Sequence, residues 1–257
     1  MTFNDHDRSN VDGQTVFVVG AGSGIGRGAA LHLARRGMRV ACVDRTIEPV
    51  AELANKIVAT GDSAIAAMAD VTDPDSVQQA FAAAVAEFGQ IHAVVNCAGI
   101  QGPMGRRSHE VELADFDAAV AVNLRGALVV SRAALPHLVE QQYGRIAHVA
   151  SIAGKEGNPS MIGYSASKAG LIGLVKAMAK EYATDGITIN ALAPAVIRTN
   201  FLDSQPQEVI DYMTSRIPMG RVGTIEEVAE MITFMVSPAC SFTTGFCFDA
   251  SGGRATY

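Results

Sequence analysis

Three side chains near the middle of the chain could together move a proton to or from an alcohol oxygen. Tyr164 and Lys168 are four residues apart, so on a helix they project from one face about one turn apart. A lysine ammonium beside a phenol favours the phenolate and lowers the tyrosine pKa from its usual value near ~10. Such a tyrosine can take a proton from an alcohol or return one to a ketone oxygen. Ser151, which follows the apolar run Ile146–Ala150, could hydrogen-bond the same oxygen.

A glycine-rich turn near the N-terminus points to a phosphate-bearing cofactor. The apolar, β-branched run Thr15–Val19 has the composition of a strand covered on both faces. The glycine turn follows it, and an amphipathic helix then runs to about Arg36. Glycines let the backbone approach a pyrophosphate closely, and the helix N-terminus offers free N–H groups and a positive dipole end. The residues predicted to bind there are Gly20, Ser23, Gly24, Ile25 and Gly26.

The end of the next expected strand, Arg39–Val43, bears on the choice between NAD and NADP. Asp44 lies roughly 20 residues beyond the glycine turn, where an acidic residue meets the adenosine ribose in dinucleotide-binding folds. A carboxylate there accepts hydrogen bonds from the ribose hydroxyls and repels a 2′-phosphate, which favours NAD. The adjacent Arg45 could bind a 2′-phosphate, so NADP is the less favoured alternative.

Strand-like runs alternate with helical segments along the chain. Strands are expected at 15–19, 39–43, 64–68, 93–96, 144–151, 188–193 and 246–249. This alternation is typical of βαβ units. We therefore predict an α/β fold, a Rossmann-type doubly wound parallel seven-stranded sheet with helices on both faces. No repeat or linker divides the chain, so residues 1–257 are expected to form a single domain, with 1–13 as a loose leader.

Composition argues against several other classes of protein. The 257 residues are 49% hydrophobic with a net charge of −6, which suits one packed domain. We find no basic run suited to nucleic acid and no apolar stretch approaching the ~20 residues that span a bilayer. The four cysteines lack Cys-x-x-Cys spacing and are expected to be reduced thiols in a cytoplasmic protein. The histidines do not pair at metal-ligand spacing, so no metal is expected.

One polar residue stands out in an expected helix from about Leu113 to Leu138. Asn123 lies within an apolar stretch although asparagine is a poor helix former, so it is either a satisfied core residue or a site residue. Ligands of doubly wound sheets bind at the carboxyl edge of the strands. The residues expected to share that edge are Gly20, Asp44, Asn96 and Ser151.

Taken together, these positions resemble the short-chain dehydrogenase/reductase family in its single-domain form. The resemblance runs from about Gln14 to Gly252. Its landmarks, in chain order, are the Gly20/Gly24/Gly26 turn, Asp44, Asp70-Val71, Asn96-x-Ala98-Gly99, Asn123, Ser151, Tyr164-x-x-x-Lys168 and the segment from Pro194 to Thr199. Val19, Cys97 and Ala195 depart from the residues most common in the family, but none of them removes a reacting group.

The resemblance implies a role for each landmark. Tyr164 would be the catalytic acid/base, Lys168 would lower its pKa and bind the nicotinamide ribose, and Ser151 would orient the substrate oxygen. Asn123 would hold a water that links Lys168 to solvent. The further cofactor contacts implied are Asp70 and Val71 at the adenine, Asn96, Ala98 and Gly99 along the cofactor, and Pro194, Ile197 and Thr199 in the segment facing the nicotinamide. Family members are usually tetramers, built partly from the helices expected at 113–138 and 161–182, so a homotetramer is expected.

The substrate pocket should be walled by three loops, at 99–109, 152–162 and 195–217. Their polar and charged side chains favour a small polar substrate, such as a carboxylate, over a steroid or a long acyl chain. The candidate substrate residues are Gln101, Lys155, Asn158, Arg198 and, from the tail, Arg254. The tail 251–257 also resembles tails of relatives that oxidise sugars and sugar-derived acids such as 2-keto-3-deoxy-sugar acids.

Three alternatives stay open at this point. An NADPH-dependent 3-oxoacyl-(acyl-carrier-protein) reductase belongs to the same class, and Asp44 argues against it. A non-catalytic NAD-sensing protein on the same fold would not need Ser151, Tyr164 and Lys168. A methyltransferase also places a glycine turn before an acidic strand end, but it has no use for the tyrosine–lysine pair.

Overall fold

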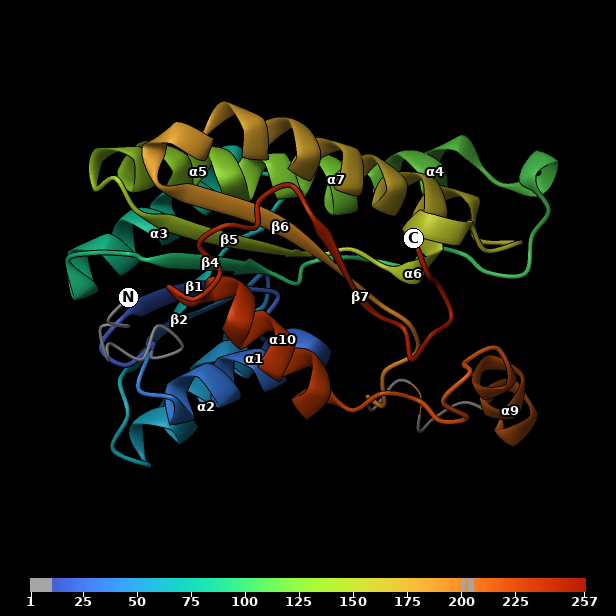
Figure 1. Cartoon of the computed structure of the whole chain (residues 1–257), viewed down its shortest axis with the longest axis horizontal. Coiled ribbons are helices and arrows are strands. Elements are labelled where there is room, and N and C mark those ends of the chain that lie inside the picture. The colour runs from blue at the N-terminus through green and yellow to red at the C-terminus, as the bar shows by residue number, and fades with distance from the viewer. Residues whose placement is uncertain (1–10, 200–201, 203–205) are drawn as a thin grey trace, which may run out of the picture.

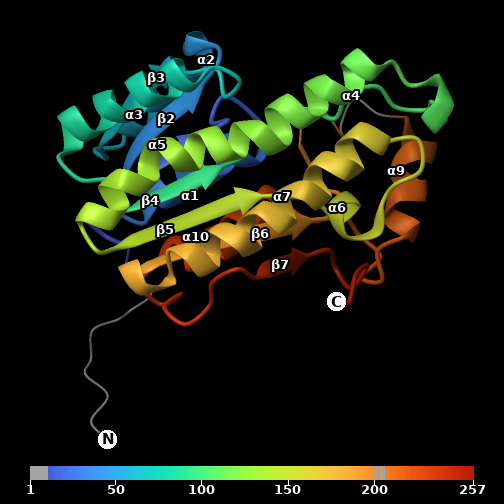
Figure 2. The same ribbon diagram turned by 90° about the horizontal axis from the view of Figure 1, so that it is seen from above.

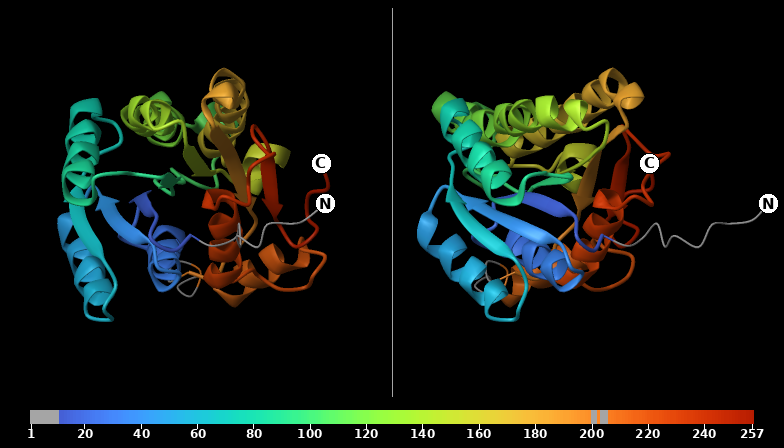
Figure 3. Two further views of the ribbon diagram at one scale, coloured as in Figure 1. Left: turned by 60° about the vertical axis from the view of Figure 1, so that its left-hand side comes forward. Right: turned by 90° about the vertical axis from the view of Figure 1, so that its left-hand side faces the viewer.

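Seven parallel strands form a single twisted sheet, seen between two helical layers in Figure 3. This computed structural model describes residues 11–199, 202 and 206–257. The strand order is β3-β2-β1-β4-β5-β6-β7, and it reverses direction between β1 and β4. The strands are β1 Thr15–Val19, β2 Arg39–Asp44, β3 Ala64–Met68, β4 Ala93–Asn96, β5 Gly144–Val149, β6 Ile187–Pro194 and β7 Cys247–Ala250. The predicted doubly wound, seven-stranded parallel sheet is confirmed.

Helices cover both faces of the sheet (Figure 1). One face packs against α1 Gly24–Arg35, α2 Ile47–Val58 and α10 Ile225–Val236, and the other against α3 Pro74–Phe88, α5 Gly126–Glu140 and α7 Ile162–Glu181. Alternation along β1 divides its side chains between these cores, since Phe17 joins one cluster while Val16 and Val18 join the other. Phe17 meets Phe81 of α3 edge to face, with ring centroids 5.3 Å apart.

Local sequence signals set several helix ends. Asp73 accepts a hydrogen bond from Asp75 N at the start of α3, and Pro74 occupies the first turn. A capping box is present at the start of α10, where Thr224 and Glu227 exchange side-chain to backbone hydrogen bonds. These caps determine the residue at which α3 and α10 begin.

The long helix predicted at 113–138 is interrupted. It comprises α4 Leu113–Val120, a π-helical turn at Ala121–Arg125 and α5, which follow one another along one line in Figure 2. This wider turn contains Asn123, whose side chain makes hydrogen bonds to Ile100 in the loop after β4. The run 113–140 is long and apolar enough to cross a membrane by length and composition alone, but 56% of its most apolar window is buried inside the fold. That burial is typical of a core helix.

Three expected loops contain more structure than the sequence indicated. Val11 is buried and Gly13 N donates to Gly37 O, so residues 11–13 belong to the fold, whereas residues 1–10 of the predicted leader lie outside the described residues. The segment after Ser151 forms a short helix, α6 Ile152–Glu156. The segment 195–217, expected to be a loop that walls the pocket, likewise contains a helix, α9 Gln207–Ser215.

Candidate active site

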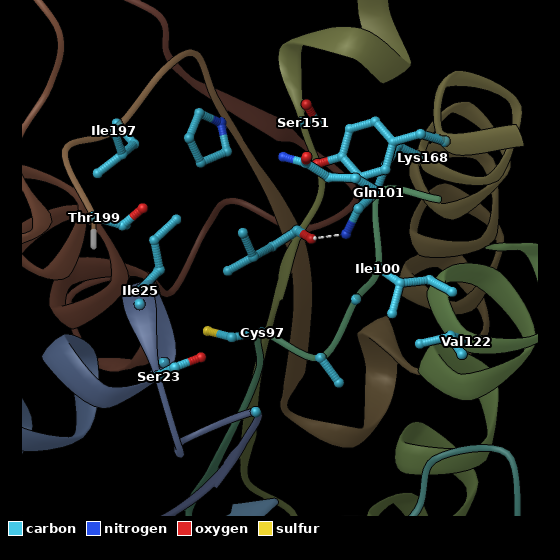
Figure 4. Close-up of a pocket in the computed structure, with 18 of the residues that line it drawn as sticks. Ser23, Ile25, Cys97, Ile100, Gln101, Val122, Ser151, Lys168, Ile197 and Thr199 are labelled. Carbon is cyan, nitrogen blue, oxygen red and sulfur yellow. Dashed lines mark hydrogen bonds between the residues drawn. The ribbon is translucent and has the colours of Figure 1, made fainter. Parts of the chain in front are cut away.

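A cleft of about 1220 Å³ opens at the carboxyl edge of the sheet (Figure 4). Loops that follow β1 to β6 line it, because every strand is parallel and delivers its carboxyl end to the same side. The predicted residues that line it are Gly20, Ser23, Gly24, Ile25, Gly26, Asp44, Arg45, Asp70, Val71, Ala98, Gly99, Gln101, Ser151, Asn158, Tyr164, Lys168, Pro194, Ile197, Thr199 and Arg254. Asn96, Asn123, Lys155 and Arg198 do not line it.

The three proton-handling residues come together as the spacing predicts. Ser151 follows β5 and caps α6, where its Oγ accepts from Ala153 N at 3.1 Å. Tyr164 and Lys168 lie one turn apart on α7. The Lys168 ammonium is buried and donates to Val149 O at 2.7 Å, a bond drawn as a dashed line in Figure 4. It lies 5.8 Å from the centroid of the Tyr164 ring.

The pKa of Tyr164 differs from the sequence-based expectation. Burial raises the pKa of its phenol above the usual value, and a hydrogen bond with Ser151 acts in the opposite direction. The sequence predicted a lowered pKa beside Lys168; the pKa is raised instead, because burial outweighs the hydrogen bond with Ser151 and the Lys168 ammonium donates to Val149 O. Burial also lowers the pKa of Lys168 itself to about 8. The lysine is therefore mainly a cation at neutral pH and loses its proton at mildly alkaline pH.

The glycine turn after β1 forms a cradle for a phosphate group. Gly20 and Gly24 have φ of +79° and +51°, a region that favours glycine. A Cβ on Gly20 would lie 2.7 Å from Ala98 N, and one on Gly26 would collide with the Gly20 carbonyl. Helix α1 begins at Gly24, and its N-cap Ser23 makes no side-chain capping bond, so the hydroxyl and the first N–H groups face the cleft. The turn thus fits the pyrophosphate of a dinucleotide.

Carboxylates stand at the ends of β2 and β3. Asp44 Oδ2 accepts from Gly22 N at 3.0 Å, which ties it to the glycine turn, and Arg45 lines the cleft beside it. Asp70 accepts from the backbone and hydroxyl of Thr72, and these bonds hold its pKa below the usual value. The Asp44 carboxylate beside the phosphate cradle fits an adenosine ribose with free hydroxyls, as predicted for NAD.

The loop after β4 is held by two buried asparagines, neither of which lines the cleft. Asn96 was predicted to contact the cofactor, but its amide points to His148 and to Ala98 N. The Asn123 amide bonds both Ile100 N and Ile100 O, at 2.8 and 2.9 Å. Each asparagine therefore positions the loop rather than offering its side chain to a ligand. The sequence analysis missed His148, and only its place on the neighbouring strand β5 reveals the connection.

The predicted substrate residues divide into two groups. Gln101, Asn158 and Arg254 line the cleft, and Arg254 donates to Glu156 Oε2 and Asn158 Oδ1, each at 2.9 Å. The prediction for Lys155 is wrong, because its buried ammonium pairs with Asp249 at 2.9 Å behind the cleft wall. The prediction for Arg198 is also wrong, since the side chain is exposed outside the cleft.

A set of three methionines also lines the cleft, and the sequence analysis did not single it out. Its methionines come from three separate segments, the loop after β4, the start of α7 and α9. They are Met104, Met161 and Met213. Only the prediction that 195–217 covers the site contained a signal for Met213. In the part of the chain that the structure describes, no group of three or more His, Cys, Asp or Glu could hold a metal ion.

Comparison with known proteins agrees with this geometry. A family model described as enoyl-(acyl carrier protein) reductase, one of those for short-chain dehydrogenases/reductases, matches residues 20–254. A 2-dehydro-3-deoxy-L-rhamnonate dehydrogenase (NAD(+)) from Sphingomonas sp. is 41% identical over 95% of this chain and 96% of its own. The chain belongs to the short-chain dehydrogenase/reductase family. It is an oxidoreductase of the kind that acts on CH–OH groups.

Other short-chain dehydrogenase/reductase relatives are nearly as long as this chain. The 3-oxoacyl-(acyl-carrier-protein) reductase FabG of Thermotoga maritima is 35% identical over 95% of this chain and 98% of its own. The crystal structure of gox2181 superposes with a TM-score of 0.93 at 29% identity, covering 96% of this chain and 97% of that one. A candidate gluconate dehydrogenase from Agrobacterium tumefaciens has a TM-score of 0.90 at 28% identity, with 96% and 97% covered.

Proposed function

We propose that this protein is an NAD-dependent dehydrogenase that interconverts a secondary hydroxyl and a ketone on a sugar-derived acid. The observation that carries the substrate class is the Arg254 guanidinium at the polar end of the cleft that holds Ser151 and Tyr164. The relative named for 2-dehydro-3-deoxy-L-rhamnonate supports this class, as does the one assigned to gluconate.

The proposed reaction assigns one task to each proton-handling residue. Ser151 Oγ and the Tyr164 hydroxyl bind the substrate oxygen, and the Tyr164 phenolate takes its proton as the alcohol is oxidised. Lys168, protonated below its pKa of about 8, supplies positive charge at the inner end of the cleft. NAD, when bound, supplies the hydride acceptor. Asn123 supports Lys168 through the loop at Ile100, and we retain the water relay near Asn123 as part of this proposal.

The residues of the cleft suit a substrate that carries a carboxylate, hydroxyl groups and some methyl or methylene groups. Glu156 and Asn158 occupy N–H groups on Nε and Nη2 of Arg254, which leaves the guanidinium edge at Nη1 for a carboxylate. Gln101 and Asn158 can hydrogen-bond substrate hydroxyls. The three methionines suit methyl or methylene groups, because thioethers adapt to irregular apolar shapes.

The assembly and compartment form part of the same proposal. Leu113, Leu128 and Ile162 are exposed apolar residues on α4, α5 and α7, the helices expected to form subunit contacts. A homotetramer would cover them, and we place it in the cytoplasm, where the four free cysteines stay reduced. No membrane or nucleic-acid partner is invoked.

A second candidate is an NADPH-dependent 3-oxoacyl-(acyl-carrier-protein) reductase. Arg45 lines the cleft beside Asp44 and could meet a 2′-phosphate, and the Thermotoga maritima relative carries that name. The Asp44 carboxylate opposes this alternative by repelling a phosphate at the same position.

One assay separates the candidates. The purified protein is incubated with NAD, and separately with NADP, at alkaline pH, and absorbance of the reduced cofactor is followed with sugars, sugar acids, 3-hydroxyacyl thioesters and simple secondary alcohols. We expect turnover with NAD on a sugar acid. Turnover confined to NADP and acyl thioesters would overturn the proposal in favour of the reductase.

A further inference from the structure

A buried chain of hydrogen bonds runs behind the cleft, from α5 to the loop after β4. Ser131 Oγ lies 2.9 Å from Ala127 O and 3.0 Å from His148 Nε2. His148 Nδ1 lies 3.2 Å from Asn96 Nδ2, and Asn96 Oδ1 lies 3.2 Å from Ala98 N. The side chains of Ser131, His148 and Asn96 are almost completely buried, so protein groups alone satisfy them.

The two backbone ends of this chain determine the direction of every bond. Ala98 N–H only donates, so the Asn96 oxygen faces it and the Asn96 NH₂ faces His148. Nδ1 of His148 must then accept, which places the proton of the neutral ring on Nε2. Ser131 Oγ accepts that proton and donates its own to Ala127 O, which only accepts. Both ends require the same polarity, and therefore one tautomer of His148.

The loop held in this way separates the phosphate cradle from the catalytic lysine. A Cβ on Gly20 would lie 2.7 Å from Ala98 N, so the glycine turn rests directly on the loop. A Cβ on Gly99 would lie 3.3 Å from Lys168 Nζ. A shift of the loop by a few tenths of an ångström would therefore move a wall of the cofactor cleft on both sides. Asn123 fixes the far end of the loop at Ile100, and Asn96 fixes the near end.

We propose that His148 is a positioning residue for cofactor binding, because its Nδ1 lone pair holds the Asn96 amide in the orientation that ties down Ala98. His148 does not line the cleft, so it acts through Asn96 and not by touching a ligand. An apolar side chain at this position would leave the buried Asn96 NH₂ without a partner and the amide free to rotate. The inference concerns NAD and in that respect rests on the proposed function.

Two substitutions of similar size separate a positioning role from a merely structural one. His148→Asn keeps an acceptor, Oδ1, where Nδ1 stood, whereas His148→Leu removes it. With the full chain and NAD as the titrant in calorimetry, we expect the leucine variant to bind NAD about tenfold more weakly and the asparagine variant to stay within about twofold of the parent. Equal dissociation constants for the two folded variants would overturn the inference.

Control variants test whether a change in NAD binding reflects a general loss of structure. Thr15→Val is the matched control, because Thr15 Oγ1 on β1 is buried and has no hydrogen-bond partner among the residues that the structure describes, so this variant should bind NAD like the parent. Folding of each variant is checked by circular dichroism. If His148→Leu does not fold, Ser131→Ala takes its place, since it removes the acceptor of the Nε2 proton together with the Ser131 hydrogen bond to Ala127 O, and leaves His148 itself intact. We expect about threefold weaker NAD binding for Ser131→Ala, and unchanged binding would overturn the inference.

The tautomer can be measured without any cofactor. Carbon and nitrogen chemical shifts of the His148 ring in isotope-labelled parent protein should report the Nε2–H form. The Nδ1–H form would overturn the hydrogen-bond polarity and the proposed role together. If the parent protein shows the Nε2–H form yet does not bind NAD, the proposed function and the cofactor role fail while the polarity stands, so the two failures are distinguishable.

Discussion

Tyr164 is the residue on which proton transfer depends, because its hydroxyl shares the cleft with Ser151 and Lys168. Tyr164→Phe removes that hydroxyl and leaves the ring in place. We expect kcat to fall about 10³-fold, within the range for loss of a general acid or base, while the dissociation constant for NAD changes by less than about threefold. Steady-state rates and NAD titration check this. Activity near that of the parent would remove Tyr164 from its assigned role.

Asp44 sets the cofactor preference through its carboxylate. Asp44→Ala should lower the preference for NAD, measured as kcat/KM with NAD divided by kcat/KM with NADP, by about tenfold. The substitution removes both the charge-assisted hydrogen bonds to the ribose and the repulsion of a 2′-phosphate. Rates with both cofactors measure the ratio.

A control for Asp44 is needed because its Oδ2 also accepts from Gly22 N. Asp44→Asn keeps an acceptor for that bond and removes only the negative charge, so it should also narrow the ratio. If both variants left the ratio unchanged, the assignment of Asp44 to the ribose would be lost.

Arg254 and Lys155 are neighbouring cations with different surroundings. Arg254 lines the cleft, whereas Lys155 pairs with Asp249 outside it. Arg254→Ala should raise KM for a sugar acid about tenfold and leave KM for a neutral sugar alcohol nearly unchanged. Lys155→Met should change neither KM value. Equal losses on the acid and the neutral compound for Arg254→Ala would argue against a carboxylate contact.

At the scale of elements, α6 must approach α7 closely for Ser151 to reach Tyr164. A Cβ on Gly154 of α6 would lie 2.6 Å from the backbone carbon of Lys168. Gly154→Ala should therefore push α6 away, lowering kcat about tenfold and the free energy of unfolding by about 1–3 kcal/mol. Rate measurements and urea denaturation test this.

The same helix pair offers a matched control. Gly173 lies in α7, and a Cβ there would meet nothing within 4 Å. Gly173→Ala should leave kcat unchanged and raise the free energy of unfolding by up to about 1 kcal/mol, since alanine favours the helix. If both alanine variants behaved alike, the close approach of α6 and α7 would not matter for turnover.

At the scale of the whole molecule, the buried His148 and the partly buried His92 link folding to pH. Burial, with a smaller contribution from the charge of Lys168, lowers the pKa of His148 to about 3. Burial also lowers the pKa of His92, whose Nδ1 accepts from Thr15 N. An unfolded histidine titrates near ~6.5. As pH falls below that value, the unfolded chain therefore binds protons that the folded protein does not bind, and the folded state becomes less stable.

This linkage predicts the direction and size of an acid effect. The stabilisation is complete above pH ~6.5 and is lost as pH falls from there toward the folded pKa of about 3. His148 alone should reduce the free energy of unfolding by about 2 kcal/mol between pH 8 and pH 5. Urea denaturation at both pH values measures this. His148→Asn should flatten the dependence, and a slope equal to that of the parent would contradict it.

Much of the site could be predicted because chemistry restricts the residue types. The glycine turn, Asp44, Ser151, Tyr164 and Lys168 all lie in the cleft as expected. Each sits at a strand end or on one helix face, positions that follow from local periodicity and turn chemistry. The seven-stranded parallel sheet could be predicted for the same reason, since alternating strands and helices leave few topologies, whereas the order of its strands is known only from the structure.

The orientation of side chains was harder to predict from the sequence, because it depends on partners that are distant along the chain. Asn96 turns away from the cleft because His148 stands beside it in register on β5. Lys155 turns away because its ammonium donates a hydrogen bond to the carboxylate of Asp249, which lies 94 residues later in the chain. Neither partner is adjacent in the chain, so spacing alone could not identify them.

The sequence by itself determined the parallel α/β fold, the dinucleotide cleft and the serine–tyrosine–lysine set, because these follow from hydrophobic periodicity, glycine placement and residue chemistry. Only the tertiary structure decided which cations reach the cleft, how the Asn96 amide is turned, and that burial raises the pKa of Tyr164. The physical reason is that desolvation and hydrogen-bond direction are properties of a packed environment, which is assembled from strands and helices far apart in the chain.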